Sequence, residues 1–165
     1  MVLTFQGGSS LVADSMEALT FDTFSKLTFS SNTAGACSLI PNGTLTISNV
    51  SDSDTDTNDV IFCDNQTTEY GAAVRVIDGS DFYGVVTISN NGGVNFSQNS
   101  STSGYGGAIY APTVYLSSNE GVCLSYNSAV DGAYGGAIYN AKNSDIGDVT
   151  GDFNNNQAVS TYGKA

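Results

Sequence analysis

The 165-residue sequence has no histidine and only four basic residues against sixteen acidic ones, which gives a formal net charge of −12. Without histidine there can be no Ser-His-Asp triad, no Cys-His pair and no His-ligated zinc site. Four scattered cations cannot form the basic footprint that nucleic acids require, so no nucleic-acid partner is expected. Charged residues make up only 12% of the chain, and this share together with few strong helix formers argues against helical bundles and coiled coils.

Cysteines and long apolar runs are also scarce. Cys37, Cys63 and Cys123 are too few for a disulfide scaffold, which leaves one bridge plus a free thiol, or buried thiols that act as small apolar side chains. No apolar run approaches about 20 residues, and residues 1–5 lack the features of a signal peptide. At 40% apolar residues the chain is nevertheless too hydrophobic for a disordered acidic tail. The composition therefore predicts a compact, β-rich protein.

What the sequence does contain is two repeated tetrapeptides. The first has the form Phe-x-x-Asn, and its copies begin 28 to 34 residues apart. Its copies run from Phe29 to Asn32, Phe62 to Asn65, Phe96 to Asn99 and Phe153 to Asn156, with a variant copy from Leu124 to Asn127. The second is Gly-Gly-Ala-Ile, with copies at Gly106, Gly107, Ala108, Ile109 and at Gly135, Gly136, Ala137, Ile138. Each perfect Gly-Gly-Ala-Ile copy is flanked by tyrosines, a near copy occupies 71–74, and degenerate copies begin at Gly35 and end at Ala165. A period near 30 residues indicates a solenoid.

Each repeat holds three short stretches of alternating polarity, separated by turn residues, and there is no helix between them. This pattern predicts an all-β, right-handed parallel β-helix with three short strands per turn and about four to five turns. The phenylalanines are predicted to stack in the core, and each asparagine to adopt the left-handed conformation at a corner while bonding to the asparagines above and below. The glycines are predicted to permit a tight corner.

The predicted organisation is a single β-helix over 1–165. Residues 1–25 are predicted to form an irregular first turn, followed by repeats at 26–65, 66–99, 100–127 and 128–156. Because the chain stops inside a motif at Ala165, we expect a fragment of a longer solenoid, with an open edge capable of self-association.

An acidic insertion at 51–59 interrupts the second repeat. Asp52, Asp54 and Asp56 have the spacing that opens an EF-hand loop, but Thr57 stands where glycine is needed and no glutamate follows at position twelve. The segment is therefore interpreted as a solvated loop whose aspartates could contact a partner. No metal and no cofactor is expected.

The register also makes a prediction about thiols. Cys63 follows a ladder phenylalanine by one residue and Cys123 precedes Leu124 by one, so both side chains should face outward. They are predicted to lie two turns apart, about 9–10 Å, which is too far for a disulfide.

The ordered alternation of Gly-Gly-Ala-Ile and Phe-x-x-Asn over about residues 18 to 163 resembles the passenger domains of the chlamydial polymorphic membrane proteins. The resemblance implies a secreted autotransporter, exposed on the bacterial outer membrane, that adheres to host cells. Membrane attachment would run only through a barrel absent from this sequence.

The leading hypothesis is a non-enzymatic adhesin segment that binds a host-cell surface protein receptor. One alternative is a structural spacer or self-assembling module without its own receptor. A more distant alternative is a polysaccharide-acting enzyme of the β-helix class, whose candidates would be Asp78, Asp81 and Arg75.

Overall fold

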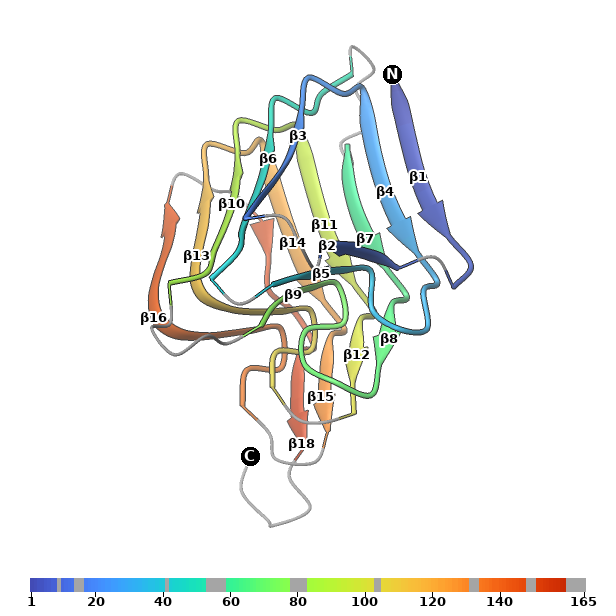
Figure 1. Ribbon diagram of the computed structural model, residues 1–165, viewed down its shortest axis with the longest axis vertical. Coiled ribbons are helices and arrows are strands. Elements are labelled where there is room, and N and C mark those ends of the chain that lie inside the picture. Colours follow the sequence, from blue (N-terminus) through green and yellow to red (C-terminus); the bar gives the residue numbers. More distant parts are fainter. Residues whose placement is uncertain are drawn as a thin grey trace.

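The computed structural model describes residues 1–8, 10–13, 17–40, 42–52, 59–77, 83–102, 105–130, 134–147 and 151–159. Within these ranges every regular element is a β-strand, and strands that are distant in the sequence lie side by side (Figure 1). Each strand pairs in parallel with the equivalent strand of the next repeat. The protein is therefore all-β, with its repeats stacked as successive rungs.

The rungs contribute to three parallel sheets. The first contains β1 (Val2–Gln6), β4 (Lys26–Ser30), β7 (Val60–Cys63), β11 (Gly93–Ser97), β14 (Gly121–Ser125) and β17 (Gly151–Asp152). The short third sheet contains β8 (Gln66–Thr67), β12 (Ser100–Ser101), β15 (Ser128–Val130) and β18 (Gln157–Val159). The second sheet contains β2 (Leu11–Ala13), β3 (Ala18–Asp22), β5 (Cys37–Leu39), β6 (Thr44–Ser48), β9 (Val74–Val76), β10 (Val85–Ser89), β13 (Ile109–Ser117) and β16 (Ile138–Gly147).

A rung is thus built differently from the prediction in two places. Two of the three short strands predicted in each repeat are one continuous strand in β13, whose pairing with β16 shifts between Ala111 and Thr113, on either side of Pro112. A short strand that was not predicted follows most of the Phe-x-x-Asn copies, as β8, β12, β15 and β18 do. The described strands group into five rungs, numbered 1 to 5 along the chain, and a sixth rung begins at residue 151. The five rungs comprise, in order, residues 2–22, 26–48, 60–89, 93–117 and 121–147.

Residues 1–25 do not form the irregular first turn that was predicted. β1 pairs with β4 in unbroken register, β2 with β5 and β3 with β6. Alternation of Leu3 and Phe5 with polar residues is sufficient to form the strand, although the segment lacks both tetrapeptides. The first rung is therefore a regular one.

The phenylalanines of the first sheet stack through the core, as predicted. Phe5, Phe29, Phe62 and Phe96 lie with ring centroids 4.7–4.8 Å apart and interplanar angles of 3–6°. Leu124 continues the column in register with Phe96 and is fully buried. Phe153 differs from the prediction, since its side chain is 47% exposed and no later rung covers it in the described part of the chain.

The asparagines form the predicted ladder. The Nδ2 of Asn65 donates to the backbone oxygen of Phe29 (3.1 Å) and to the Oδ1 of Asn99 (2.9 Å), while its own Oδ1 accepts from the Nδ2 of Asn32 (2.9 Å). The same amide-to-amide bond continues from Asn99 to Asn127 and from Asn127 to Asn156. The five asparagines thus occupy one column, and four of them are fully buried.

The left-handed conformation, however, belongs to the residue before each asparagine and not to the asparagine itself. That preceding position has a φ of 54–57° in every copy: Ser31, Asp64, Gln98, Tyr126 and Asn155. The hydrogen bonds of the asparagine amide stabilise the corner, and the exposed residue before the asparagine adopts the strained φ.

A second asparagine ladder was not predicted. The Nδ2 of Asn91 donates to the Oδ1 of Asn119 (3.0 Å) and to the backbone oxygen of Ile47 (3.2 Å). Asn91 also accepts from the backbone N–H of Val50 (2.9 Å) through its Oδ1. These residues stabilise the corner that follows β6, β10 and β13, where Asn49, Asn90 and Ser118 have positive φ.

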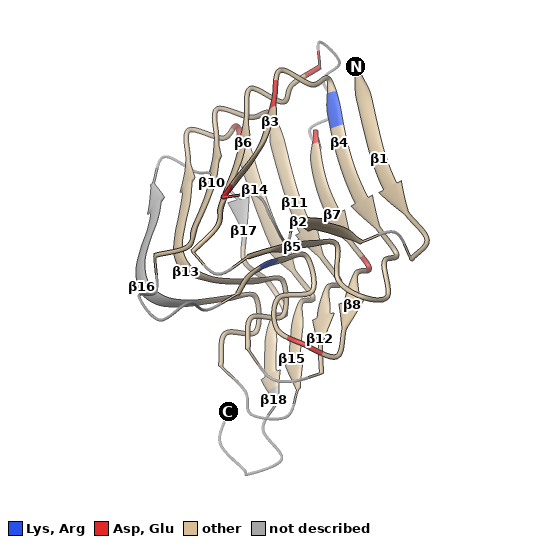
Figure 2. Cartoon of the chain, viewed as in Figure 1, with Lys and Arg blue, Asp and Glu red and all other residues tan. Residues whose placement is uncertain are grey.

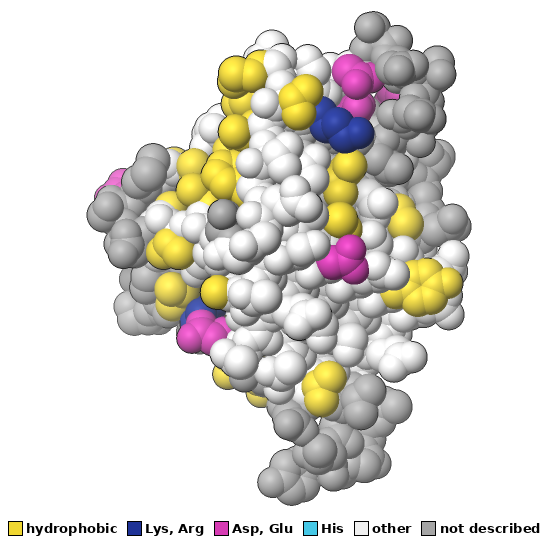
Figure 3. Space-filling view, turned by 90° about the vertical axis from the view of Figure 1, so that its right-hand side faces the viewer, with side chains coloured by type: hydrophobic (Ala, Val, Ile, Leu, Met, Phe, Trp, Pro, Cys, Tyr) yellow, Lys and Arg dark blue, Asp and Glu magenta, His cyan; other side chains and the backbone are white. Residues whose placement is uncertain are grey.

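Charged residues are placed mainly at the ends of strands (Figure 2). The face shown in Figure 3 consists mostly of uncharged polar side chains and backbone, with few charged groups and scattered hydrophobic groups. Among the described residues no helical segment has the length and apolarity needed to span a bilayer.

Candidate binding surface

The tetrapeptide residues predicted as binding motifs are buried wherever a rung lies on both sides of them. Phe29, Phe62, Phe96 and Leu124 are fully buried, as are Asn32, Asn65, Asn99, Asn127, Ala108 and Ile109. The second Gly-Gly-Ala-Ile copy, Gly135, Gly136, Ala137 and Ile138, is half-buried. A side chain without solvent exposure cannot contact a receptor, so these residues act by building the rungs.

The first glycine of the second tetrapeptide is required by its backbone. Gly106 has a φ of +59° and Gly135 a φ of +65°, and a Cβ on either would overlap the carbonyl oxygen of the isoleucine three residues later. A Cβ on Gly107 would overlap the backbone of Gly136 in the next rung. The first glycine therefore permits the corner, and the second permits the close approach of neighbouring rungs.

The degenerate copy has its corner glycine at Gly35, as predicted, since Gly35 has a φ of +79°. Its core residue comes one position early, because Cys37 pairs with Val74, which in turn pairs with Ile109. Cys37 thus fills the isoleucine position in the core, and burial raises the pKa of its thiol to about 12.

The motif presents tyrosines outward. Because side chains alternate along a strand, the residue after each inward Ile or Val points away from the core. This position forms one column, Arg75, Tyr110 and Tyr139. The residue before the first glycine is tyrosine in all three rungs, and Tyr105 pairs with Tyr134. We call Tyr70, Tyr105, Tyr110, Tyr134 and Tyr139 the tyrosine cluster.

The rings of the tyrosine cluster contact one another within and across columns. Tyr105 stacks on Tyr134 and Tyr110 on Tyr139, each pair with centroids 5.5 Å apart and interplanar angles of 14° and 9°. Tyr70 meets Tyr105 and Tyr110 at 4.8 Å, and Tyr105 meets Tyr139 edge to face at 5.1 Å. Tyr134 is 59% exposed whereas Tyr110 is 6% exposed, so the cluster is a packed layer with an accessible end.

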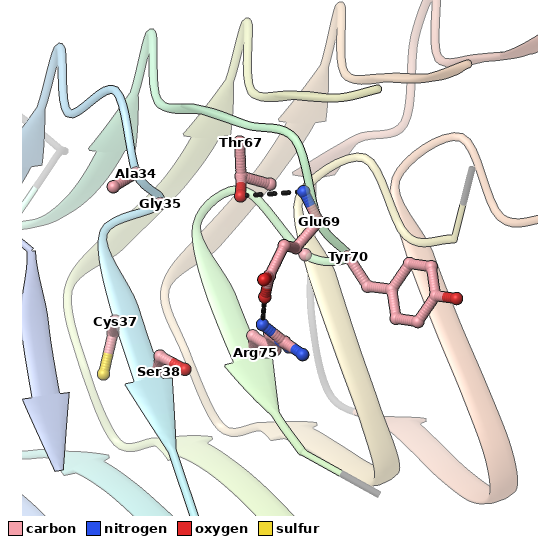
Figure 4. A pocket seen from close by; sticks show the side chains of 9 residues that line it. Ala34, Gly35, Cys37, Ser38, Thr67, Glu69, Tyr70 and Arg75 are labelled. Atoms are coloured by element: carbon pink, nitrogen blue, oxygen red, sulfur yellow. Dashed lines mark hydrogen bonds and ion pairs between the residues drawn. The ribbon is translucent and has the colours of Figure 1, made fainter. Parts of the chain in front are cut away.

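A shallow pocket adjoins the cluster at Arg75 (Figure 4). Arg75 forms an ion pair with Glu69, whose backbone N–H donates to the Oγ1 of Thr67 (3.1 Å). The pocket encloses about 20 Å³, room for a single water molecule, and the ring of Tyr70 points away from it. The pocket is too small to hold a ligand. The Arg75–Glu69 ion pair that lines it lies at the border of the tyrosine cluster.

The predicted positions of the cysteines are confirmed. Cys63 and Cys123 lie two rungs apart on the first sheet, in register with Ser97 and Asn95 respectively, and their side chains are partly exposed. All three cysteines are free thiols. Burial and, less strongly, the neighbouring Asp64 raise the pKa of Cys63.

The remaining predicted site residues are mostly outside the described residues. Asp52 is exposed, while Asp54 and Asp56 of the acidic loop and Asp78 and Asp81 of the enzyme hypothesis are not described. In the part of the chain that the structure describes, no group of three or more Cys, Asp or Glu side chains could hold a metal ion.

The tyrosines that flank each Gly-Gly-Ala-Ile copy are visible in the sequence, but their packing into one cluster is not. What was missing was the register between rungs, which brings residues before and after the glycine corner into one layer.

Comparison with known proteins identifies the repeat. Residues 85–112 match the family model of the Chlamydia polymorphic membrane protein repeat, and this span contains one complete copy of each tetrapeptide. No curated protein and no solved structure matched the chain. The resemblance stated from the two tetrapeptides is therefore confirmed over residues 85–112, which match a Chlamydia polymorphic membrane protein repeat.

Proposed function

We propose that this chain is a segment of a surface-exposed, autotransporter-like passenger on the bacterial outer membrane, and that it is a non-enzymatic adhesin for a host-cell protein receptor. Its rungs would form a right-handed parallel β-helix, attached to the membrane through a barrel outside this sequence. The family repeat at residues 85–112 supports the surface placement.

The observation that carries the adhesin role is the stacking of the tyrosine cluster. Tyrosine supplies a large amphipathic contact area at a small cost in conformational entropy, and it is enriched where proteins bind proteins. The stacking of Tyr105 on Tyr134 and of Tyr110 on Tyr139 fixes the rings before any partner arrives. A rigid surface of this kind avoids part of the ordering cost of association.

A second candidate is a structural spacer or self-assembling module. The burial of the tetrapeptides that lie between two rungs favours it, because these buried residues build rungs and offer no side chain to a receptor. The two candidates differ in whether the outward surface, and the tyrosine cluster in particular, binds anything.

The test is attachment of beads coated with the full chain to cultured host cells, with beads coated with an unrelated protein of similar charge as the control. The adhesin proposal expects specific attachment that soluble chain competes away in a saturable manner. Attachment no greater than that of the control beads would overturn the proposal and favour the spacer.

A further inference from the structure

We propose that the tyrosine cluster is a binding site for an arginine-bearing segment of the partner protein. The inference rests on the proposed function, since it names the chemistry of the receptor surface that the adhesin would contact. It follows from the ring geometry, from the charge of the protein and from a residue within the cluster's own column.

The rings offer both faces and edges at one surface. The two columns are linked by edge-to-face contacts, from Tyr105 to Tyr110 at 68° and from Tyr105 to Tyr139 at 64°. A cation is attracted to the electron-rich face of an aromatic ring when it lies within about 6 Å of the centroid. Tyr134, 59% exposed, provides accessible ring surface.

The charge of the protein selects for a cationic partner. The net charge is −12, so a basic segment is attracted to the molecule and an acidic one is repelled. The cation that borders the cluster, Arg75, is ion-paired with Glu69, whose side chain is 57% exposed. Because Glu69 balances its charge, Arg75 does not repel the guanidinium of a partner.

The column itself already accommodates a guanidinium. Arg75 occupies in rung 3 the position that Tyr110 and Tyr139 occupy in rungs 4 and 5, and it is the register neighbour of Tyr110. The fold thus places an arginine next to a tyrosine in this layer. Arginine is favoured over lysine, because its planar and weakly hydrated guanidinium stacks on aromatic faces.

The experiment measures binding of three labelled synthetic peptides of equal length, with alternating Arg-Ser, Lys-Ser and Glu-Ser sequences, to the full chain. Fluorescence anisotropy of the peptide gives the affinity. Because the chain has no tryptophan, its intrinsic emission comes from its nine tyrosines, of which five form the cluster. We expect the Arg-Ser peptide to bind more tightly than the Lys-Ser peptide and to quench this emission, and the Glu-Ser peptide not to bind.

Three variants locate the site. Tyr105→Leu with Tyr139→Leu should weaken Arg-Ser binding roughly tenfold, the effect of losing about two cation–π contacts. Tyr105→Phe with Tyr139→Phe keeps the ring faces and should retain affinity within about twofold. Tyr115→Leu removes a 38% exposed tyrosine further along β13 and should change nothing.

Circular dichroism and thermal unfolding establish that each variant is folded. If the double leucine variant does not fold, Tyr134→Leu replaces it, since that side chain is largely exposed. Equal affinity for the Arg-Ser and Lys-Ser peptides together with indifference to the leucine variants would mean attraction by net charge alone, and would overturn the inference. Absence of binding would overturn it as well.

These outcomes can be separated from failure of the proposed function. Specific cell attachment without any preference for the Arg-Ser peptide would leave the adhesin in place and refute the arginine site. Tyrosine-dependent peptide binding without cell attachment would refute the adhesin alone.

Discussion

At the scale of single residues, glycines at positive φ differ in how much space surrounds them. Gly106 has a φ of +59°, and a Cβ there would overlap the Ile109 carbonyl, whereas Gly35 has a φ of +79° with no atom closer than 3.6 Å to an added Cβ. Gly106→Ala combines backbone strain with a backbone clash and should lower the free energy of unfolding by about 3 kcal/mol or more. Gly35→Ala carries the strain alone and should cost about 1–2 kcal/mol.

Urea unfolding of the two glycine variants beside the parent provides the measurement. Equal losses would contradict the account, since they would mean that the backbone around Gly106 relaxes freely.

The thiol of Cys37 makes the stability of the fold depend on alkaline pH. In the unfolded chain it ionises near the usual pKa of 9.0, whereas burial raises the pKa of Cys37 to about 12. Between these values the unfolded state releases a proton that the folded state keeps, so the free energy of unfolding falls by about 1.4 kcal/mol per pH unit. Below pH 9 the thiol is protonated in both states, and its contribution is constant.

Cys37→Val is the matched control, because valine occupies the equivalent position 74 in the next rung. The difference in unfolding free energy between parent and variant should change with this slope from pH 9 to 11. Parallel curves for the two proteins would show that Cys37 is not buried.

Residue types predicted which side chains face inward but not which residue adopts the left-handed φ at the corner. Ser31, Gln98 and Tyr126 all occupy the left-handed position although their side chains differ widely in size and shape. Their conformation is imposed by the hydrogen bonds of the asparagine that follows each of them. Because the following asparagine determines this conformation, the residue type at the left-handed position itself shows no pattern in the sequence.

At the scale of elements, the asparagine ladder should contribute more to stability than any single polar contact on the surface. Asn99→Leu removes two donated and two accepted hydrogen bonds and leaves the backbone N–H and the Nδ2 of Asn65 without the Oδ1 that accepted from them. Each buried polar group left unsatisfied costs about 1–3 kcal/mol, so the loss should exceed about 3 kcal/mol. Ser97→Ala, at the end of β11 and two residues before Asn99, should stay within about 0.5 kcal/mol of the parent.

Chemical denaturation of the Asn99→Leu and Ser97→Ala variants measures the two losses of stability. Comparable stability of Asn99→Leu and Ser97→Ala would mean that the ladder does not hold the corner.

The phenylalanine stack has a buried middle and an exposed last member. Phe96→Ala should cost about 3–5 kcal/mol, as expected when a fully buried aromatic side chain leaves a cavity. Phe153→Ala removes a side chain that is 47% exposed and should cost less than half of that. Thermal or urea unfolding measures both, and a reversed order of the two losses would contradict the assignment.

The elements missed from the sequence are those with too little length to show a period. β8 and β12 contain two residues each, and two residues cannot display alternation. The continuity of β13 was missed for the opposite reason, because Pro112 suggests a break where the strand bends and carries on.

At the scale of the whole molecule, the period of about 30 residues predicted the stacked parallel rungs, the phenylalanine column and the asparagine column. It did not predict the regular first rung, whose Phe5 is followed three residues later by Gly8 instead of asparagine. In agreement with this substitution, the Oδ1 of Asn32 is buried without a hydrogen-bond partner. The tyrosine cluster also needed the structure, because it combines residues from three rungs and from both sides of the glycine corner.

The central claim is that the tetrapeptides build the fold and the tyrosines contact the partner. Phe62→Leu with Ile109→Val changes both tetrapeptides conservatively, since Leu124 and Val74 already occupy equivalent positions in other rungs. The account predicts that beads coated with this folded variant attach to host cells as the parent does, and that beads coated with the folded Tyr105→Leu, Tyr139→Leu variant lose most of their attachment. Loss of attachment by the tetrapeptide variant, with attachment retained by the tyrosine variant, would contradict it.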